Sequence, residues 1–281
     1  MTAAAAWTPY RVRAANTAVA SENKIHDDEV ARRFGFRGGL VPGVDVYAYL
    51  THPVVAAWGR PWLERGTIAA RFAQPVYDGD EVEVRAEPAG GASAGGPPEV
   101  ALTLHDGRGE LCATATAALP DEPATSPDPA RYPVAPLPDD PPPASPETLA
   151  AADPLGTVEA TFRAERAPEY LDDVREGLPL YRTEGLAHPG WLLRFANHAL
   201  AANVVLGPWI HVASEVRNWA AVRDGRRVAA RGRVAELFER KGHRFVVLDV
   251  LMVADDSSPV LQVRHTAVYQ PRAADRGTAD R

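Results

Sequence analysis

The stretch SENKIHDDEVARRFGFRGGLVPGV, residues Ser21 to Val44, decides the fold of this chain, because a buried helix begins where it ends. Ile25 and His26 lie among charged and neutral polar side chains near its start. After Gly43 the run VDVYAYLTHPVVAAW has the apolar spacing of a helix, and Pro53 is expected to end or kink that helix. The stretch therefore predicts a polar loop followed by a core helix.

Strand-like runs follow this helix, and the same order of elements recurs later. The first four are TIAARFAQPV, DEVEVRAEP, EVALTLHD and ELCATATAAL, and the last two flank the hairpin signal Asp106-Gly107-Arg108-Gly109. A second helical pattern covers 188–206 and is followed by WIHVASEVRNWAAV, RVAARGRVAELFE, RFVVLDVLMVA and VLQVRHTAVYQ. An Asp224-Gly225 turn separates the first two of these runs. One helix and a meander of long strands, twice over, predict an α+β fold in which two antiparallel sheets each wrap around a central helix.

Proline marks the boundary between the two halves. Residues 120–146 contain 11 of the chain's 26 prolines, and a segment so poor in N–H donors is expected to run as a semi-rigid, extended linker. At its end, Ser145 and Pro146 are typical of a helix start with serine as the N-cap. The predicted division is an N-terminal unit 1–119, a linker 120–146, a C-terminal unit 147–272 and a disordered tail 273–281.

Composition narrows the class of protein. A chain of 281 residues that is 46% hydrophobic can bury one large core or two ordinary ones. Its net charge of −7 and its scattered basic residues predict neither a nucleic-acid partner nor a membrane partner. The N-terminus has no leader pattern and no apolar run reaches the length of a membrane span, so a cytoplasmic location is predicted. Cys112, the single cysteine, is expected to be a buried and inert thiol.

Three separated motifs in the first half occur in an order typical of one protein family. The opening stretch keeps these elements of the family pattern: Asn23, Ile25, His26, Ala31 and the frame Gly38-Gly39-Leu40-Val41-x-Gly43. Further on, RFAQPVYDGDEVEV, residues 71–84, is similar to a strand and turn of the form Phe-x-x-Pro-Val-x-x-Gly-Asp. These motifs resemble the MaoC-like acyl dehydratases, which include the R-specific enoyl-CoA hydratases and have the hot-dog fold. The resemblance covers about residues 10–118, and with a generic hot-dog pattern in the second half it implies a double hot-dog within one chain.

The chain departs from the family pattern at three positions. Ser21 stands where the family has its catalytic Asp, Lys24 replaces a Pro, and Pro42 replaces the His before the helix glycine. Only the first change bears directly on chemistry, because losing one of two cooperating catalytic groups costs on the order of 10² to 10⁴ in rate. Three functions stay open: an acyl-thioester hydratase or dehydratase, a hot-dog thioesterase, and a non-catalytic acyl-thioester-binding protein.

The resemblance also implies roles for residues of the opening stretch. Hydration of an enoyl thioester needs a base for the water, an acid for C2 and donors for the charge on the thioester oxygen. His26 would be the acid and base, and the Gly43 N–H would be the oxyanion donor at a helix start formed with Val41 and Pro42. The candidate water-orienting residues are Ser21, Glu22 and Asn23. The implied substrate is an acyl thioester of coenzyme A or of an acyl carrier protein, with no cofactor.

The second half has polar residues of its own. His188-Pro189-Gly190 corresponds to Val41-Pro42-Gly43 of the first half, so His188 and Gly190 are candidates for a second anion site at a helix start. Asn197 falls inside the apolar helix that follows, where a buried amide needs a partner, and it is a candidate substrate contact. Asp78-Gly79-Asp80 is typical of a plain turn, and no metal site is predicted. The chain is expected to act as a monomeric double hot-dog or as a homodimer.

Overall fold

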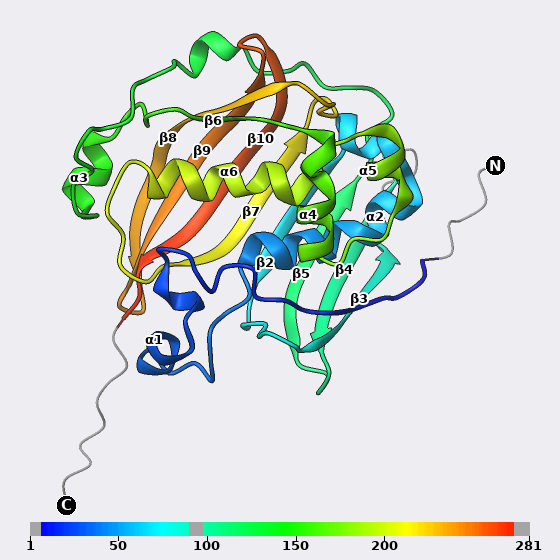
Figure 1. Cartoon of the computed structure of the whole chain (residues 1–281), viewed down its shortest axis with the longest axis horizontal. Helices are drawn as coiled ribbons and strands as arrows, with labels where there is room; N and C mark the ends of the chain where they lie inside the picture. The colour runs from blue at the N-terminus through cyan, green and yellow to red at the C-terminus, as the bar shows by residue number, and fades with distance from the viewer. Residues whose placement is uncertain (1–6, 90–97, 273–281) are drawn as a thin grey trace, which may run out of the picture.

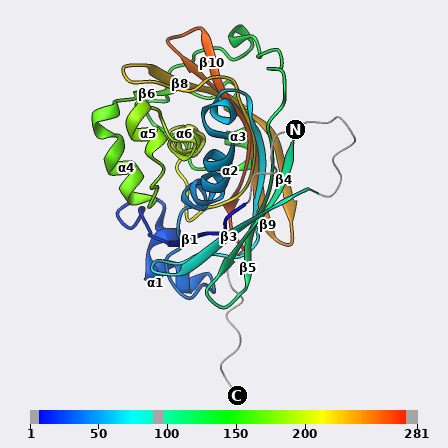
Figure 2. The ribbon, with the colours of Figure 1, turned by 90° about the vertical axis from the view of Figure 1, so that its right-hand side faces the viewer.

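A single curved sheet wraps around a pair of helices in this protein (Figures 1 and 2). The computed structural model describes residues 7–89 and 98–272, and the tail predicted at 273–281 lies outside the described residues. Within these described ranges the sheet has ten antiparallel strands, and its inner face packs against α2 (Gly43–Arg65) and α6 (Pro189–Ala201). The α+β double hot-dog architecture predicted from the sequence is confirmed.

Short elements complete each half of the fold. The strands are β1 (Tyr10–Arg13), β2 (Thr67–Phe72), β3 (Glu81–Pro88), β4 (Glu99–Asp106), β5 (Leu111–Ala118), β6 (Val158–Thr161), β7 (Ile210–Asn218), β8 (Arg227–Arg240), β9 (His243–Ala254) and β10 (Ser258–Gln270). The other helices are α1 (Asp28–Arg33), α3 (Pro146–Ala151), α4 (Ala167–Asp173), α5 (Pro179–Glu184) and the 3-10 helices η1 (Lys24–His26), η2 (Pro129–Arg131) and η3 (Ala164–Arg166). In Figure 2, α4 and α5 lie on the side of α6 that faces away from the sheet. The elements β1, β6, α4 and α5 were not predicted, because segments this short have too little periodicity.

The strand order differs from the predicted meander. The sheet runs β1-β3-β4-β5-β2-β7-β10-β9-β8-β6, so the first strand after each central helix pairs with the last strand of its half. The Asp224-Gly225 turn therefore leads into β8 without forming a β7–β8 hairpin. Strands β2 and β7 pair from Thr67↔Arg217 to Arg71↔Ala213, which joins the two predicted sheets into one. A turn signal specifies a change of chain direction but not which strand becomes the neighbour.

Helix α2 forms the centre of the first half. It continues through Pro53, and its non-helical residue lies six positions later at Gly59, with φ 58° and ψ −149°. The break predicted at the proline is therefore wrong in position, and glycine supplies the backbone freedom that the kink requires. Helix α6 lies close beside α2, because a Cβ placed on Gly190 would be 3.0 Å from the Cβ of Ala48.

The Pro-rich linker lies against the second half of the sheet. Tyr132 packs on Leu251 and Val253, and its hydroxyl donates a hydrogen bond to Asp249 Oδ2 at 3.0 Å. At the end of the linker, Ser145 caps α3, which confirms the predicted helix start. Within the part of the chain that the structure describes, no helix is long and apolar enough to cross a membrane.

Candidate functional site

A compact loop between β1 and α2 holds His26. Asp27 caps α1, and the N–H of Leu40 donates to the carbonyl of Ile25 at 3.2 Å, so that both apolar side chains pack in one small cluster. Gly39 lies against the backbone of His26, and a Cβ placed there would overlap the His26 carbonyl oxygen. The glycine frame recognised in the sequence therefore allows the chain to fold back over the histidine.

The two ring nitrogens of His26 have different partners. Nδ1 lies 2.6 Å from the carbonyl oxygen of Leu40, which can only accept, so Nδ1 bears the proton and donates. Nε2 is then the basic nitrogen, and it accepts a hydrogen bond from Asn23 Nδ2 at 3.3 Å. Burial lowers the pKa of His26, and the Leu40 carbonyl and the Asp45 carboxylate offset this effect in part. His26 is therefore neutral at neutral pH, with a lone pair on Nε2.

Asn23 connects the two halves of the chain. Its Oδ1 accepts from the N–H of Trp209 at 3.1 Å, and its Nδ2 donates to the carbonyl of Trp209 at 2.9 Å. The second Nδ2 proton is the one directed at His26. The amide thus orients the imidazole and ties the loop to a residue 186 positions away. The sequence predicted Asn23 as a water-orienting residue, and it did not predict the bonds to Trp209.

The N-terminus of α2 borders the same space. Its N-cap, Pro42, makes no side-chain cap, and the Pro42 carbonyl accepts from the N–H groups of Asp45 and Val46. The N–H of Gly43, the first helical residue, has no intrahelical acceptor and lies at the positive end of the helix dipole. This N–H can therefore bind an oxygen atom that carries negative charge.

Two cavities meet at His26. The inner cavity, of about 280 Å³, is lined mainly by apolar side chains that include Phe72, Val76, Phe245 and Val268. The outer cavity, of about 700 Å³, has a more polar lining that includes Ser21, Glu22, Arg194 and His198. The residues that line both are Asn23, His26, Pro42, Asn197 and Trp209. His26 is the one titratable side chain among these five shared residues.

Asn197 and Asn203 of the second half differ in their bonding. The amide of Asn203 donates to the carbonyls of Gly156 and Ala199 and accepts from the Gly156 N–H, so it is bonded entirely within the protein. Asn197 Oδ1 is buried and has no hydrogen-bond partner among the described residues, and this side chain lines both cavities. Because an unpaired buried amide oxygen is costly, Asn197 is a candidate ligand contact.

The start of α6 is closed by protein atoms. His188 is the N-cap, its Nδ1 accepts from the N–H of Gly190 at 3.0 Å, and Pro189 has no N–H to offer. The hydroxyl of Tyr170 occupies the place where a Cβ of Gly190 would lie. Neither His188 nor Gly190 lines a cavity at His26. The second anion site predicted at this helix start therefore does not form, because its N–H group is already bonded.

The remaining predicted residues lie on different sides of the junction. Val41 lines the inner cavity, whereas Ser21 and Glu22 line only the outer one. Ser21 Oγ donates to the carbonyl of Asn23 at 3.3 Å, and Glu22 is exposed. The position at which the resembling enzymes have a carboxylate therefore contains a hydroxyl bonded within its own loop.

Three residues of this region were not predicted as site residues. Asp45, in the first turn of α2, is fully buried and accepts from Thr17 Oγ1 at 2.6 Å and from Arg194 Nη2 at 2.8 Å. An aspartate inside an otherwise apolar helix is a signal that could have found this pair. His211 of β7 lies with its ring against Gly43, but the sequence shows it only as one of several polar residues in the second half.

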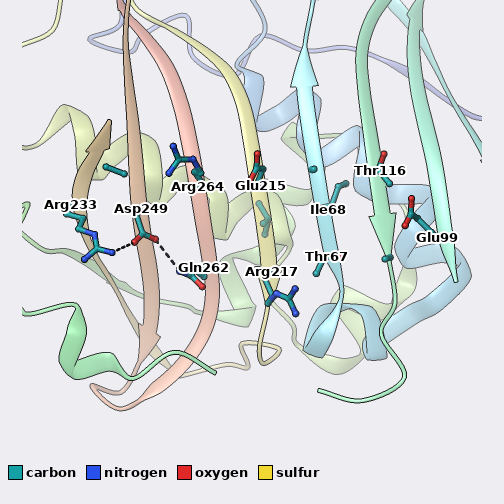
Figure 3. Close-up of a pocket in the computed structure, with 14 residues that line it drawn as sticks. Thr67, Ile68, Glu99, Thr116, Glu215, Arg217, Arg233, Asp249, Gln262 and Arg264 are labelled. Carbon is teal, nitrogen blue, oxygen red and sulfur yellow. Dashed lines mark hydrogen bonds and ion pairs between the residues drawn. The ribbon is translucent and has the colours of Figure 1, made fainter. Parts of the chain in front are cut away.

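A separate groove of about 630 Å³ crosses the outer face of the sheet, away from α2 and α6 (Figure 3). Within it Arg233 pairs with Asp249 at 2.8 Å, and Gln262 donates to the same carboxylate at 3.2 Å. None of the predicted site residues lines this groove. The junction at His26, which combines a buried base with an open helix N-terminus, is therefore the candidate active site.

Known proteins share this fold but not a detectable sequence pattern. No protein-family model matches the sequence, and no curated protein matches it. A solved MaoC-like dehydratase is 14% identical, with a TM-score of 0.60 over 94% of this chain and 98% of that chain. A conserved hypothetical protein of Mycobacterium tuberculosis with a double hotdog fold is 16% identical, with a TM-score of 0.57 over 93% of this chain and 95% of its own. A protein of Novosphingobium aromaticivorans described as a thioesterase is 13% identical, with a TM-score of 0.53 over 83% of this chain and 88% of its own.

These similarities define the class of protein to which the chain belongs. It is a double hot-dog protein, with two helix-and-sheet halves joined through β2 and β7. The structures that share this fold include dehydratases and thioesterases. At identities of 13–16% the likeness shows the fold alone, so the activity has to be argued from the site.

Proposed function

We propose that this protein adds water to an enoyl thioester, or removes it from a 3-hydroxyacyl thioester, as a hydratase or dehydratase of the MaoC-like type. The supporting observation is the position of His26, whose basic Nε2 lies at the junction of two cavities bordered by the open N-terminus of α2. A base and an oxyanion donor at one junction are the groups that proton removal next to a thioester carbonyl requires. The thioester oxygen would bind at Gly43, with C2 at His26.

The two cavities correspond to the two ends of an acyl thioester. The apolar inner cavity, bordered by Phe72 and Val76, would bind the acyl chain. The outer cavity, which passes Ser21 and Glu22, would hold the arm that links the sulfur to coenzyme A or to a carrier protein. Asn197, with its unpaired Oδ1 at the junction, would accept a hydrogen bond from the 3-hydroxyl group or from the attacking water.

A single base would perform both proton transfers. The Asp45 carboxylate is bonded to Arg194 and Thr17, and Ser21 has no basic group at its hydroxyl. In dehydration, Nε2 of His26 takes a proton from C2, the C2–H electrons form the C2=C3 double bond, and the C3–O bond breaks. The same proton then passes to the departing oxygen, which leaves as water. Hydration is the reverse, so hydrogen and hydroxyl add to one face of the double bond.

Turnover of a series of trans-2-enoyl-CoA esters tests the assignment of His26. Activity should fall at least about 100-fold in His26→Ala, because a positioned acid or base contributes roughly 10²- to 10⁴-fold. His105→Gln, on β4 and outside both cavities, is the matched histidine control and should keep wild-type activity. Equal turnover by wild type and His26→Ala would refute the proposed role.

The products separate this function from the two alternatives. A hydratase leaves the thioester intact, so no free thiol appears during turnover. Release of coenzyme A thiol from a saturated acyl-CoA would instead identify a thioesterase. Calorimetric binding of acyl-CoA without conversion of any ester in the series would identify a binding protein, in agreement with the serine at position 21.

A further inference from the structure

His211 borders the inner cavity, and the chemistry described above does not use it. It lies on β7, is 6% exposed, and lines the cavity together with Gly43. Its Nδ1 is buried and has no hydrogen-bond partner among the residues that the structure describes. A buried polar atom without a partner, at the wall of a ligand-sized cavity, indicates a group whose partner is the ligand.

The ring of His211 faces the open N-terminus of α2. A Cβ placed on Gly43 would lie 2.7 Å from His211 Nδ1 and 3.0 Å from its Cγ, so the imidazole packs directly against the first helical residue. The ring of Phe72 meets the imidazole at its edge, and the ring of His265 stacks on it with centroids 4.1 Å apart. These contacts hold the imidazole in one orientation beside the Gly43 N–H.

A β-bulge sets the direction of His211. In the pairing of β7 with β10 the register shifts between Thr266 and Ala267, so that Val212 has no residue opposite it. Alternation along a regular strand would send the side chains of His211 and Ser214 to opposite faces. With the bulge, both side chains are buried and bonded to each other, and His211 lies against Gly43 of α2. Bulges of this kind are frequent next to active sites, where they redirect a side chain.

The second ring nitrogen begins a buried chain of hydrogen bonds. His211 Nε2 lies 2.8 Å from Ser214 Oγ, which lies 2.9 Å from His265 Nδ1. Burial lowers the pKa of His211 well below its usual value, and His265 adds to this effect. Burial also lowers the pKa of His265 to about 3. Both imidazoles are therefore neutral, and the chain does not store a proton for the site.

The two directions of this chain differ in where they leave an N–H without a protein partner. If His265 Nδ1–H donates to Ser214 and the Ser214 hydroxyl donates to His211 Nε2, the unpaired N–H is that of His211 Nδ1 at the cavity wall, and the interior keeps only the lone pair of His265 Nε2. The opposite direction also lets His211 Nε2 donate to the Ala213 carbonyl at 3.2 Å, but it buries an unpaired N–H on His265. Because a ligand in the cavity can accept from His211 Nδ1–H but does not reach His265 Nε2, and orphaned buried N–H groups are rare, the first direction is favoured. In this direction the N–H proton of the neutral His211 imidazole is on Nδ1.

We propose that His211 is a second catalytic residue, which donates a hydrogen bond from Nδ1–H to the thioester oxygen beside the N–H of Gly43. This inference rests on the proposed function. As His26 removes the C2 proton, negative charge develops on the thioester oxygen, and two preorganised donors stabilise it. No proton leaves His211, and Ser214 and His265 act as positioning residues that fix its tautomer.

Two substitutions of His211 separate a neutral donor from an acid or base. His211→Asn keeps a side-chain N–H near the position of Nδ1, whereas His211→Phe keeps a ring without a donor. His211→Phe should lower kcat by roughly 10² to 10³ with little change in KM, and His211→Asn should stay within about tenfold of wild type. Equal losses in both variants would refute the neutral donor, and an unchanged kcat in His211→Phe would overturn the inference. Ser214→Ala should lower kcat by less than His211→Phe, because it removes the positioning bond but not the donor.

An infrared measurement tests the contact of His211 with the thioester independently of hydratase activity. Two hydrogen bonds should shift the infrared carbonyl band of bound butyryl-CoA to lower frequency in wild type and His211→Asn, with part of the shift lost in His211→Phe. If no enoyl-CoA is converted but this band pattern is found, the hydratase proposal fails and the contact of His211 with the thioester stands. If wild type is active and His211→Phe matches it in rate and band position, only the inference fails. Should His211→Phe not fold, the rates and bands of His211→Asn and Ser214→Ala decide.

Discussion

Replacing Asn23 by Asp exchanges an NH₂ group for an oxygen atom at the contact that orients the base. In the wild-type protein Asn23 Nδ2 lies 3.3 Å from His26 Nε2 and 2.9 Å from the carbonyl oxygen of Trp209. Burial keeps the pKa of His26 below its usual value of 6.5, so the imidazole is neutral at pH 7. A carboxylate at this distance favours the imidazolium and should raise the histidine pKa by roughly 1–3 units.

The consequence for catalysis is a change in the pH dependence of Asn23→Asp. The wild-type kcat/KM should be constant from pH 8 down to 6.5 and should fall only at lower pH, as His26 takes up a proton. In Asn23→Asp the acidic limb of this profile should move upward by about 1–3 units. Each unit by which the His26 pKa exceeds the assay pH reduces the basic form about tenfold. Loss of absorbance by the conjugated enoyl thioester provides the rate at each pH.

Asn23→Leu is the uncharged control for this experiment. It removes both hydrogen bonds to Trp209 without adding a charge, so its rate and its melting temperature should fall, but the acidic limb should not move upward. A profile of Asn23→Asp that coincides in pH with that of wild type, or one displaced to lower pH, would refute Nε2 of His26 as the base.

Two further substitutions and one change of pH test the surroundings of the site. Gly43→Ala should lower activity by at least about tenfold, because its Cβ would lie 2.7 Å from His211 Nδ1, whereas Gly177→Ala, with nothing within 4 Å, should be neutral. Asn203→Leu should lower the free energy of unfolding by about 2–4 kcal/mol in urea titrations, because it leaves a buried backbone N–H and two carbonyls unpaired, and an unchanged midpoint would contradict this. The free energy of unfolding should also fall as the pH drops from 6.5 toward 3. Burial lowers the pKa of His265 to about 3 in the folded protein, whereas it is 6.5 in the unfolded chain, so the unfolded chain binds the proton first. Urea midpoints at pH 7 and pH 5 measure this effect, and His265→Phe should reduce the difference between them.

The spacing of residues along the sequence determined most of the secondary structure and the central motif of the site. The 3.6-residue and 2-residue periods placed both central helices and eight of the ten strands, because they reflect which side of each element is buried. The motif around His26 and Gly43 predicted a base and a helix start within one short stretch, and the structure places both at the walls of one cavity. These features depend on residues within a few positions of one another.

Only the tertiary structure decided which distant residues complete the site. The bond between Asn23 and Trp209 spans 186 positions, and the order β5-β2-β7-β10 brings His211 to the start of α2. Equivalent sequence patterns at the two helix starts also have opposite outcomes, because His188 caps one of them while the other is left open. Such differences depend on crossover connections, on a bulge in β7 and on the packing of side chains far apart in the chain. Periodicity contains no information about them, since it records burial along one element and not the neighbour that provides it.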